Sequence, residues 1–244
     1  MTPPKPKAAS KPKQKQKQKQ KQAQSTHKVP PVIASDADFA CHIAALIDVE
    51  PHFAALYKIT GKVDLRWLDP GFSGLVRVIA GQQISAAAGL AIFKRCEAAL
   101  SKLAPSAVLA AETDTLRATG LSWPKIRTLR TLAETVEAGA LDLDGLLRIE
   151  AEAAIAELCA VKGIGRWTAE VYLLFAAGHP DIFPAGDLAL QNAVRQGFAL
   201  AERPTEKALA AMAQDWQPFR SAAARLLWAY YAAMKHGGQN AAPA

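Results

Sequence analysis

Hydrophobic residues recur at helical spacing along the chain from Ser35 onward. Apolar positions return every three or four residues, and no stretch alternates apolar and polar residues as a half-buried strand would. Ser35 precedes an acidic first turn and is typical of a helix N-cap, while Gly120 and Gly139 follow apolar segments at the position of a C-terminal cap. The pattern predicts an all-α protein of about ten or more helices. The expected helical segments are 35–47, 72–83, 85–100, 105–111, 113–120, 123–139, 143–149, 150–161, 166–178, 188–200, 205–216 and 218–236.

Basic charge is concentrated at the start of the chain. The 244 residues carry a formal charge of +7, but residues 1–28 hold nine of the 29 basic residues and no acid, which leaves 20 basic and 22 acidic residues for the rest. Residues 13–22 alternate Lys and Gln and offer nothing to bury, so we expect 1–30 and the short end 239–244 to be disordered. The tail is either a polycation that contacts DNA phosphates or a solubilising segment.

The remaining composition is that of a cytoplasmic globular protein. Half of the residues are hydrophobic, yet no apolar run approaches the roughly 20 residues that cross a bilayer, and the N-terminus lacks the apolar segment of a signal peptide. Cys41, Cys96 and Cys159 lie far apart and share no CxxC spacing. We therefore expect no zinc site, no iron–sulfur cluster and no membrane partner.

A glycine-containing hairpin separates two apolar helical segments near the middle of the chain. Its four residues are Lys162, Gly163, Ile164 and Gly165, and the second helix is expected to start at about Arg166. Exposed N–H groups at that helix start, together with the positive end of its dipole, can bind a DNA phosphate without reading a base. An ordinary αα-hairpin with glycine caps is the alternative.

Asp187 is an isolated acid in the segment FPAGDLALQ, just before an apolar helix. As a helix N-cap it would accept hydrogen bonds from the backbone of the first turn. As a functional acid it would stand rigidly at the edge of a cleft. Both roles are compatible, since a cap position holds a carboxylate in place.

Five motifs together resemble one known family. From the N-terminal side, the motifs are GLVRVIAGQQIS, GLSWPKIRTLRTLA, LCAVKGIGRWTAEVYLLFA, PAGDLAL and WQPFRSAAARLLW. Their order along the chain resembles that in helix-hairpin-helix (HhH-GPD) DNA glycosylases of the alkylation-repair type, the 3-methyladenine DNA glycosylase II group. The resemblance covers residues 35–236. It implies a glycosylase domain at 31–238 with two helical lobes, one at about 75–185 and one joining 31–74 to 186–238, with the active cleft between them.

The resemblance also implies an activity. Members hydrolyse the N-glycosidic bond of flipped alkylated purines, 3-methyladenine and 7-methylguanine, in double-stranded DNA and so begin base excision repair, which an AP endonuclease continues. Asp187 matches the catalytic carboxylate. Trp167 stands where lyase-competent members carry a nucleophilic lysine, so we expect a monofunctional enzyme without strand cleavage. We also expect the enzyme to be a monomer. There are two alternatives. The protein is either a non-catalytic DNA-binding module or a glycosylase for uracil and other deaminated or oxidised bases.

By the same resemblance, aromatic residues line the base pocket. Trp167 and Trp228 match its positions, and electron-rich indoles can stack on a flipped cationic base with a gain of about 0.5–2 kcal/mol. The pocket tyrosine of some relatives falls at Val171 here, with Tyr172 beside it. Both tryptophans could instead be core residues.

Further residues match the family's DNA contacts. The turn holding Gln82, Gln83 and Ser85 corresponds to the wedge that fills the hole left by a flipped base, and Gln83 takes the wedge position; the alternative is a polar turn with Ser85 as N-cap. Lys162 and Arg166 flank the hairpin and could contact phosphates. Arg220 either does the same or pairs with an acid. The resemblance allows a bound monovalent cation at the hairpin carbonyls and implies no other cofactor.

Overall fold

The structure is a computed structural model that describes residues 31–63, 65 and 67–236. Within these ranges regular secondary structure is helical throughout and no strand is present, which confirms the all-α prediction. The α-helices are α2 (Asp36–Val49), α3 (His52–Thr60), α4 (Phe72–Gly81), α5 (Ala86–Leu100), α6 (Pro105–Ala110), α7 (Thr113–Ala118), α8 (Trp123–Glu137), α9 (Ala151–Cys159), α10 (Arg166–Phe175), α11 (Leu188–Gly197), α12 (Glu206–Met212) and α13 (Arg220–His236). Two 3₁₀ turns, η1 (Gly145–Arg148) and η2 (Ala213–Trp216), complete the set. The predictions for 1–30 and 239–244 lie outside the described residues.

Local signals place most helix ends correctly. The Ser35 hydroxyl accepts a hydrogen bond from the Asp38 N–H at 3.2 Å, and Gly120 and Gly139 adopt φ values of 95° and 68° just beyond α7 and α8. Only glycine reaches this left-handed region at little cost, so these helices stop where the sequence predicts. Helix α3 was absent from the expected segments. It buries only Phe53 and Leu56, which is too short an apolar stripe to reveal a helix by its period.

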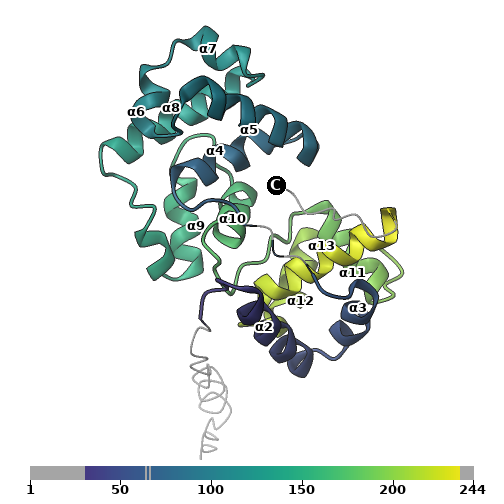
Figure 1. Cartoon of the computed structure of the whole chain (residues 1–244). Coiled ribbons are helices and arrows are strands. Elements are labelled where there is room, and N and C mark those ends of the chain that lie inside the picture. Colours follow the sequence, from purple (N-terminus) through teal and green to yellow (C-terminus); the bar gives the residue numbers. More distant parts are fainter. Residues whose placement is uncertain (1–30, 64, 66, 237–244) are drawn as a thin grey trace, which may run out of the picture.

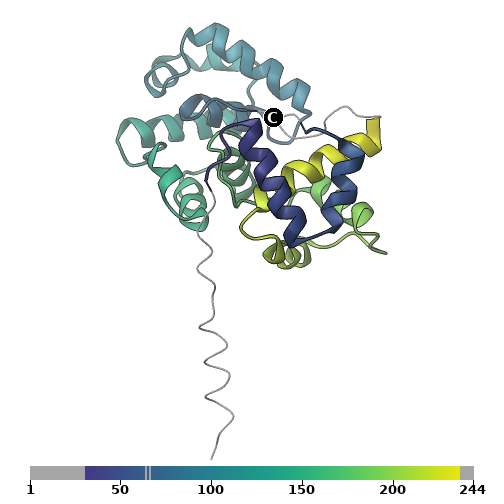
Figure 2. The ribbon, with the colours of Figure 1, turned by 60° about the horizontal axis from the view of Figure 1, so that its bottom comes forward.

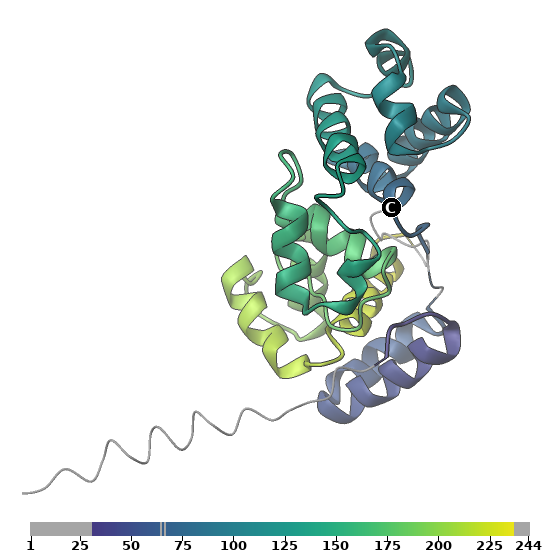
Figure 3. The same cartoon turned by 90° about the vertical axis from the view of Figure 1, so that its left-hand side faces the viewer.

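The helices form two groups (Figure 1). Helices α4 to α10 make one group, in which α4 contacts α5, α8 and α10. The other group contains α2, α3 and α11 to α13, with α13 against α2, α3 and α11. Seen from the side, the blue and teal helices of the first group stand apart from the purple helices of the second (Figure 3). Helices from both ends of the described chain thus share one core, as the purple and yellow helices show side by side in Figure 2.

Helix α10 is the buried element of the first group. Every residue from Thr168 to Phe175 is buried, so the helix is covered on all sides. Fully burying a side chain such as Leu173 or Leu174 stabilises the fold by about 1.5–3 kcal/mol each. Only the first turn of α10 reaches the surface, and that turn follows directly on the hairpin. The core therefore fixes the direction in which the hairpin projects.

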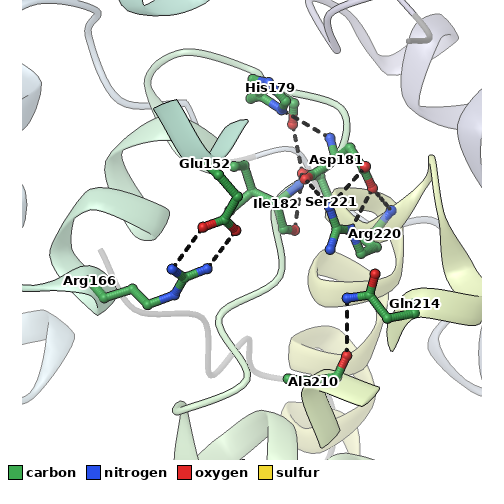
Figure 4. Close-up of polar contacts among 9 residues, drawn as sticks. All are labelled: Glu152, Arg166, His179, Asp181, Ile182, Ala210, Gln214, Arg220 and Ser221. Atoms are coloured by element: carbon green, nitrogen blue, oxygen red, sulfur yellow. Dashed lines mark hydrogen bonds and ion pairs between the residues drawn. The ribbon is translucent and has the colours of Figure 1, made fainter. Parts of the chain in front are cut away.

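The connection from α10 to α11 is fastened to the start of α13 (Figure 4). The Ser221 hydroxyl donates to the His179 carbonyl at 2.6 Å and accepts from the Ile182 N–H at 2.9 Å. The Arg220 guanidinium holds both carboxylate oxygens of Asp181, at 2.7 and 3.0 Å. Of the two expectations for Arg220, pairing with an acid is the one the structure shows. This connection leads into Asp187. The hydrogen bonds from Arg220 and Ser221 to the connection therefore help to position that carboxylate.

Candidate active site

Asp187 caps the N-terminus of α11, as its position in the sequence predicts. Carboxylate oxygen Oδ1 accepts the N–H groups of Ala189 and Leu190 at 2.9 and 3.1 Å. These donors hold the carboxylate at the positive end of the α11 helix dipole. The side chain is partly exposed, so the acid is both fixed and reachable.

Two indole rings complete the hold on this carboxylate. Trp167 Nε1 donates to Oδ2 at 3.0 Å, and Trp228 Nε1 donates to Oδ1 at 3.2 Å. Trp167 comes from α10 and Trp228 from α13, so the two helix groups meet at Asp187. With donors on both oxygens, the carboxylate keeps one orientation. A fixed negative charge of this kind can stabilise positive charge that develops beside it.

A pocket of about 370 Å³ opens next to Trp167, which is large enough for a small ring system. Its walls come from α4, from the turn after it, from the start of α5 and from α10. Residues that line it include Arg77, Val78, Gln83, Ile84, Trp167 and Val171. The crossing of α4 and α5 beside it is close, since a Cβ on Gly89 would stand 2.7 Å from the Gly81 Cα. Trp167 is thus shared between the pocket and Asp187.

Of the three aromatic residues predicted at the base pocket, only Trp167 is among the residues that line this pocket. Trp228 is fully buried and stacks on Phe175 at 5.4 Å, so it reaches the site through Asp187 and not through the pocket. Tyr172 is also misplaced by the sequence prediction, because its side chain points into the core, where its hydroxyl accepts the Gly71 N–H at 3.1 Å and burial raises its pKa to about 12. Its neighbour Val171 faces the pocket instead. One residue along a helix is a turn of about 100°, which separates the two side chains.

The turn between α4 and α5 presents Gln83 to solvent. Gln83 is exposed, borders the pocket and has a left-handed φ of 60°, an uncommon conformation for a residue with a side chain. Gln82 is engaged instead, because its amide donates to the Thr168 hydroxyl at 2.8 Å. The Ser85 hydroxyl caps α5 by accepting the Ala88 N–H at 3.3 Å. Of the three polar residues predicted here, Gln83 is the one whose side chain has no hydrogen bond to any residue that the structure describes, and Ile84 beside it is 41% exposed.

The two hairpin positions, 163 and 165, are occupied by glycine for different structural reasons. Gly163 has a φ of 98°, and a Cβ there would overlap the Thr128 hydroxyl, so packing and backbone conformation both require glycine. Gly165 is the N-cap of α10, and a Cβ on it would meet nothing within 4 Å. Ile164 between them is buried and ties the turn to the core. The open side of Gly165 leaves the first N–H groups of α10 accessible to an anion.

Arg166 is held by acids of its own chain. Its guanidinium makes hydrogen bonds with both Glu152 oxygens, at 2.7 and 3.0 Å (Figure 4), and with Glu170 at 2.9 Å. The Glu152 carboxylate raises the pKa of Arg166, and burial raises the pKa of Glu170 to about 7 against the opposing effect of Arg166. The structure therefore assigns Arg166 to an internal ion-pair network, which differs from the expected phosphate contact. Lys162 is exposed and borders a second hollow, of about 400 Å³, with Arg127 of α8.

Arg77 is a pocket residue that the sequence reading missed. It is the one charged residue of helix α4, and its Cζ lies 5.6 Å from the centre of the Phe93 ring. Its buried Nε has no hydrogen-bond partner in the described part of the chain. A lone arginine inside the apolar motif GLVRVIAG was the available signal.

The described ranges contain no group of three or more His, Cys, Asp or Glu side chains placed to hold a metal ion. None of their helices is both long and apolar enough to span a bilayer.

Known proteins resemble this chain in sequence and in fold. DNA-3-methyladenine glycosylase 1 of Schizosaccharomyces pombe is 33% identical over 161 residues, which cover 64% of this chain and 71% of the relative. The solved structure of S. pombe 3-methyladenine DNA glycosylase (Mag1) in complex with abasic DNA superposes with a TM-score of 0.71 at 28% identity, covering 80% of this chain and 98% of the other. A DNA-3-methyladenine glycosidase from Bacillus halodurans gives a TM-score of 0.70 at 30% identity, covering 82% and 93%.

A family model described as HhH-GPD superfamily base excision DNA repair protein matches residues 76–218. The match takes in the pocket, the hairpin and Asp187. Because it extends over more than half of the sequence, the chain belongs to the HhH-GPD superfamily of base excision DNA repair proteins.

Proposed function

We propose that this protein is a monofunctional DNA N-glycosylase that flips alkylated purines, 3-methyladenine and 7-methylguanine, out of double-stranded DNA and removes them by hydrolysis. The observation that carries the proposal is the Asp187 carboxylate, held by two indole N–H groups beside a pocket of base size. The names of the relatives support the same substrate class.

The chemistry suits a single fixed acid. An alkylated purine is a cationic leaving group, so the electron pair of the C1′–N bond can pass to the base without prior protonation. Positive charge then develops on the deoxyribose, and the Asp187 carboxylate stabilises it. Water adds its oxygen to C1′ and releases a proton, for which the same carboxylate is a suitable acceptor. Trp167 borders the pocket and offers its ring face to the cationic base.

DNA contacts follow from the groups that remain free. The first N–H groups of α10, beside the open Gly165, are placed to bind a phosphate, and the exposed Lys162 adds a positive charge next to them. Gln83 projects from its turn at the rim of the pocket and is our candidate for the side chain that fills the duplex after flipping. A monovalent cation at the hairpin carbonyls stays a prediction.

Strand cleavage is not part of the proposed activity. A lyase needs an amine that attacks C1′, and the position where lyases carry it holds Trp167, whose indole is occupied with Asp187. Trapping with borohydride should therefore give no covalent adduct with DNA. We further propose that the protein acts as a monomer on chromosomal DNA in the cytoplasm, and that an AP endonuclease processes its product.

Base release from methylated DNA tests the proposal. The wild type should liberate 3-methyladenine and 7-methylguanine, whereas Asp187→Asn should lose excision and keep its affinity for undamaged duplex DNA. Asp48→Asn, which changes an exposed acid far from the pocket in sequence, is the matched control and should behave as the wild type. Near-complete excision by Asp187→Asn would refute the catalytic assignment. DNA binding without any base release by the wild type would support a non-catalytic module instead.

A further inference from the structure

The hollow of about 400 Å³ beside the hairpin is lined by positive charge. Arg127 and Arg130 of α8 and Lys162 of the hairpin border it, and none of the described residues that do so is acidic. Within the described ranges, none of these three cations forms an ion pair with a carboxylate. Like charges around one hollow repel each other, and an anion that enters relieves the repulsion. The lining is therefore that of an anion site.

Glycine at position 163 brings α8 and the hairpin together at this hollow. A Cβ on Gly163 would overlap the Thr128 hydroxyl, so only glycine lets the hairpin lie this close to α8. Arg127 directly precedes Thr128, Lys162 directly precedes Gly163, and both cations are exposed. The close packing therefore puts an exposed cation from each element beside the same hollow.

Arg130 adds a positive charge that is held in place. One terminal nitrogen of its guanidinium donates to the Ala111 carbonyl at 2.9 Å and to the Thr113 hydroxyl at 3.1 Å, so the connection between α6 and α7 fixes the group. Its buried Nε has no hydrogen-bond partner among the residues that the structure describes. Two arginines and a lysine with no acid between them suit a phosphate, which arginine binds through several N–H groups and lysine through its charge.

We propose that this hollow binds a second phosphate of the DNA backbone, next to the phosphate at the start of α10. The inference rests on the proposed function and extends the DNA contact from the hairpin to α8. Gly163 borders the hollow, and Gly165, which faces open space, follows two residues later. Two residues of backbone span at most about 7 Å, and the phosphates of one strand follow each other about every 3.4 Å along the helix axis. One strand can therefore reach both places.

The salt dependence of binding to undamaged duplex DNA counts the phosphates that the protein neutralises. Arg127→Gln should weaken binding about tenfold at low salt and reduce the slope of log K against log salt concentration by about 0.9. Arg127→Lys keeps the charge and should keep the wild-type slope. Arg203→Gln removes an exposed arginine that does not border the hollow, and it should match the wild type in affinity and slope.

Duplexes in which one phosphate at a time is replaced by a neutral methylphosphonate locate the contact. At one position the replacement should weaken binding of the wild type about tenfold and have little further effect on Arg127→Gln. The position at which Gly165→Ala becomes insensitive should be a different, neighbouring phosphate. Coupling of both variants to the same phosphate would overturn the second site, and so would a loss in Arg127→Gln that is equal at every position.

The same measurements separate this inference from the proposed function. If Arg127→Gln keeps the wild-type affinity and slope while the wild type binds DNA and releases methylated bases, the second phosphate site is refuted and the proposed function stands. If the wild type does not bind duplex DNA, both are refuted.

Discussion

Replacing Asp187 by Asn separates the two tasks of this residue, capping and charge. Asn is as good an N-cap as Asp, so the bonds from Ala189 and Leu190 to Oδ1 should persist. The amide, however, has one acceptor oxygen where the carboxylate has two. If the amide oxygen takes the Oδ1 position, the NH₂ group takes the Oδ2 position and faces the indole N–H of Trp167. Two donors then face each other, whereas in the wild type Oδ2 accepts the indole N–H at 3.0 Å.

The size of the effect follows from this conflict. A hydrogen bond to a charged group contributes about 1.5–3 kcal/mol, and Trp167 is only partly buried, so water can satisfy its N–H in part. We therefore expect Asp187→Asn to reduce the free energy of unfolding by about 2 kcal/mol. In a Trp167→Phe background the donor is already gone, and the same change should cost about 1–2 kcal/mol less.

Urea unfolding of the wild type, the two single variants and the double variant measures this coupling. Asp48→Asn combined with Trp167→Phe is the control pair and should be additive within about 0.5 kcal/mol. Additivity for Asp187 and Trp167 would refute the reasoning, since it would mean that the indole does not hold the carboxylate. The orientation on which the proposed mechanism depends would then lack its support.

Other changes test the remaining parts. Burial raises the pKa of Glu170 from the ordinary 4.5 to about 7, so the folded state holds this proton more tightly than the unfolded chain does, and stability falls as pH rises through this window. Glu170→Gln should gain up to about 3 kcal/mol relative to the wild type between pH 4.5 and 8 in urea unfolding, and a constant difference would contradict this. Gly163→Ala should lower the unfolding midpoint through overlap with Thr128. Gly165→Ala should leave stability nearly unchanged but weaken duplex DNA binding about tenfold in a titration. Deleting residues 1–28 should reduce the salt dependence of DNA binding, and an unchanged slope would exclude tail contact.

Local chemistry made much of the fold predictable. Ser35, Gly120 and Asp187 each sit at a helix end because their own side chain or backbone freedom favours that position. The hairpin is of the same kind, since its glycines and flanking apolar segments are adjacent in sequence. Helix α3 escaped detection because two buried side chains make no clear period.

Side-chain partners distant in sequence were beyond such reasoning. The sequence predicted that Arg166 beside the hairpin could contact a phosphate. In the structure, Arg166 at the start of α10 donates to Glu152 of α9, which lies 14 residues away in sequence. The bond from Gln82 to Thr168 spans 86 residues and depends on how α4 meets α10. The orientation of Tyr172 turns on the rotation of a helix that is buried on every side, where the apolar pattern marks no preferred face.

Helix α10 links the proposed phosphate contact to the proposed chemistry. Gly165 at its N-cap faces open space, and Trp167, two residues later, borders the pocket and holds Asp187. One inserted residue between them would rotate the indole by about 100° and shift it by about 1.5 Å, enough to break its bond to the carboxylate. Asp187 lies at the end of the connection from α10 to α11, and Arg220 holds this connection through Asp181. Because α10 is buried, the packing of the core sets the distance between the proposed phosphate contact and the Asp187 carboxylate.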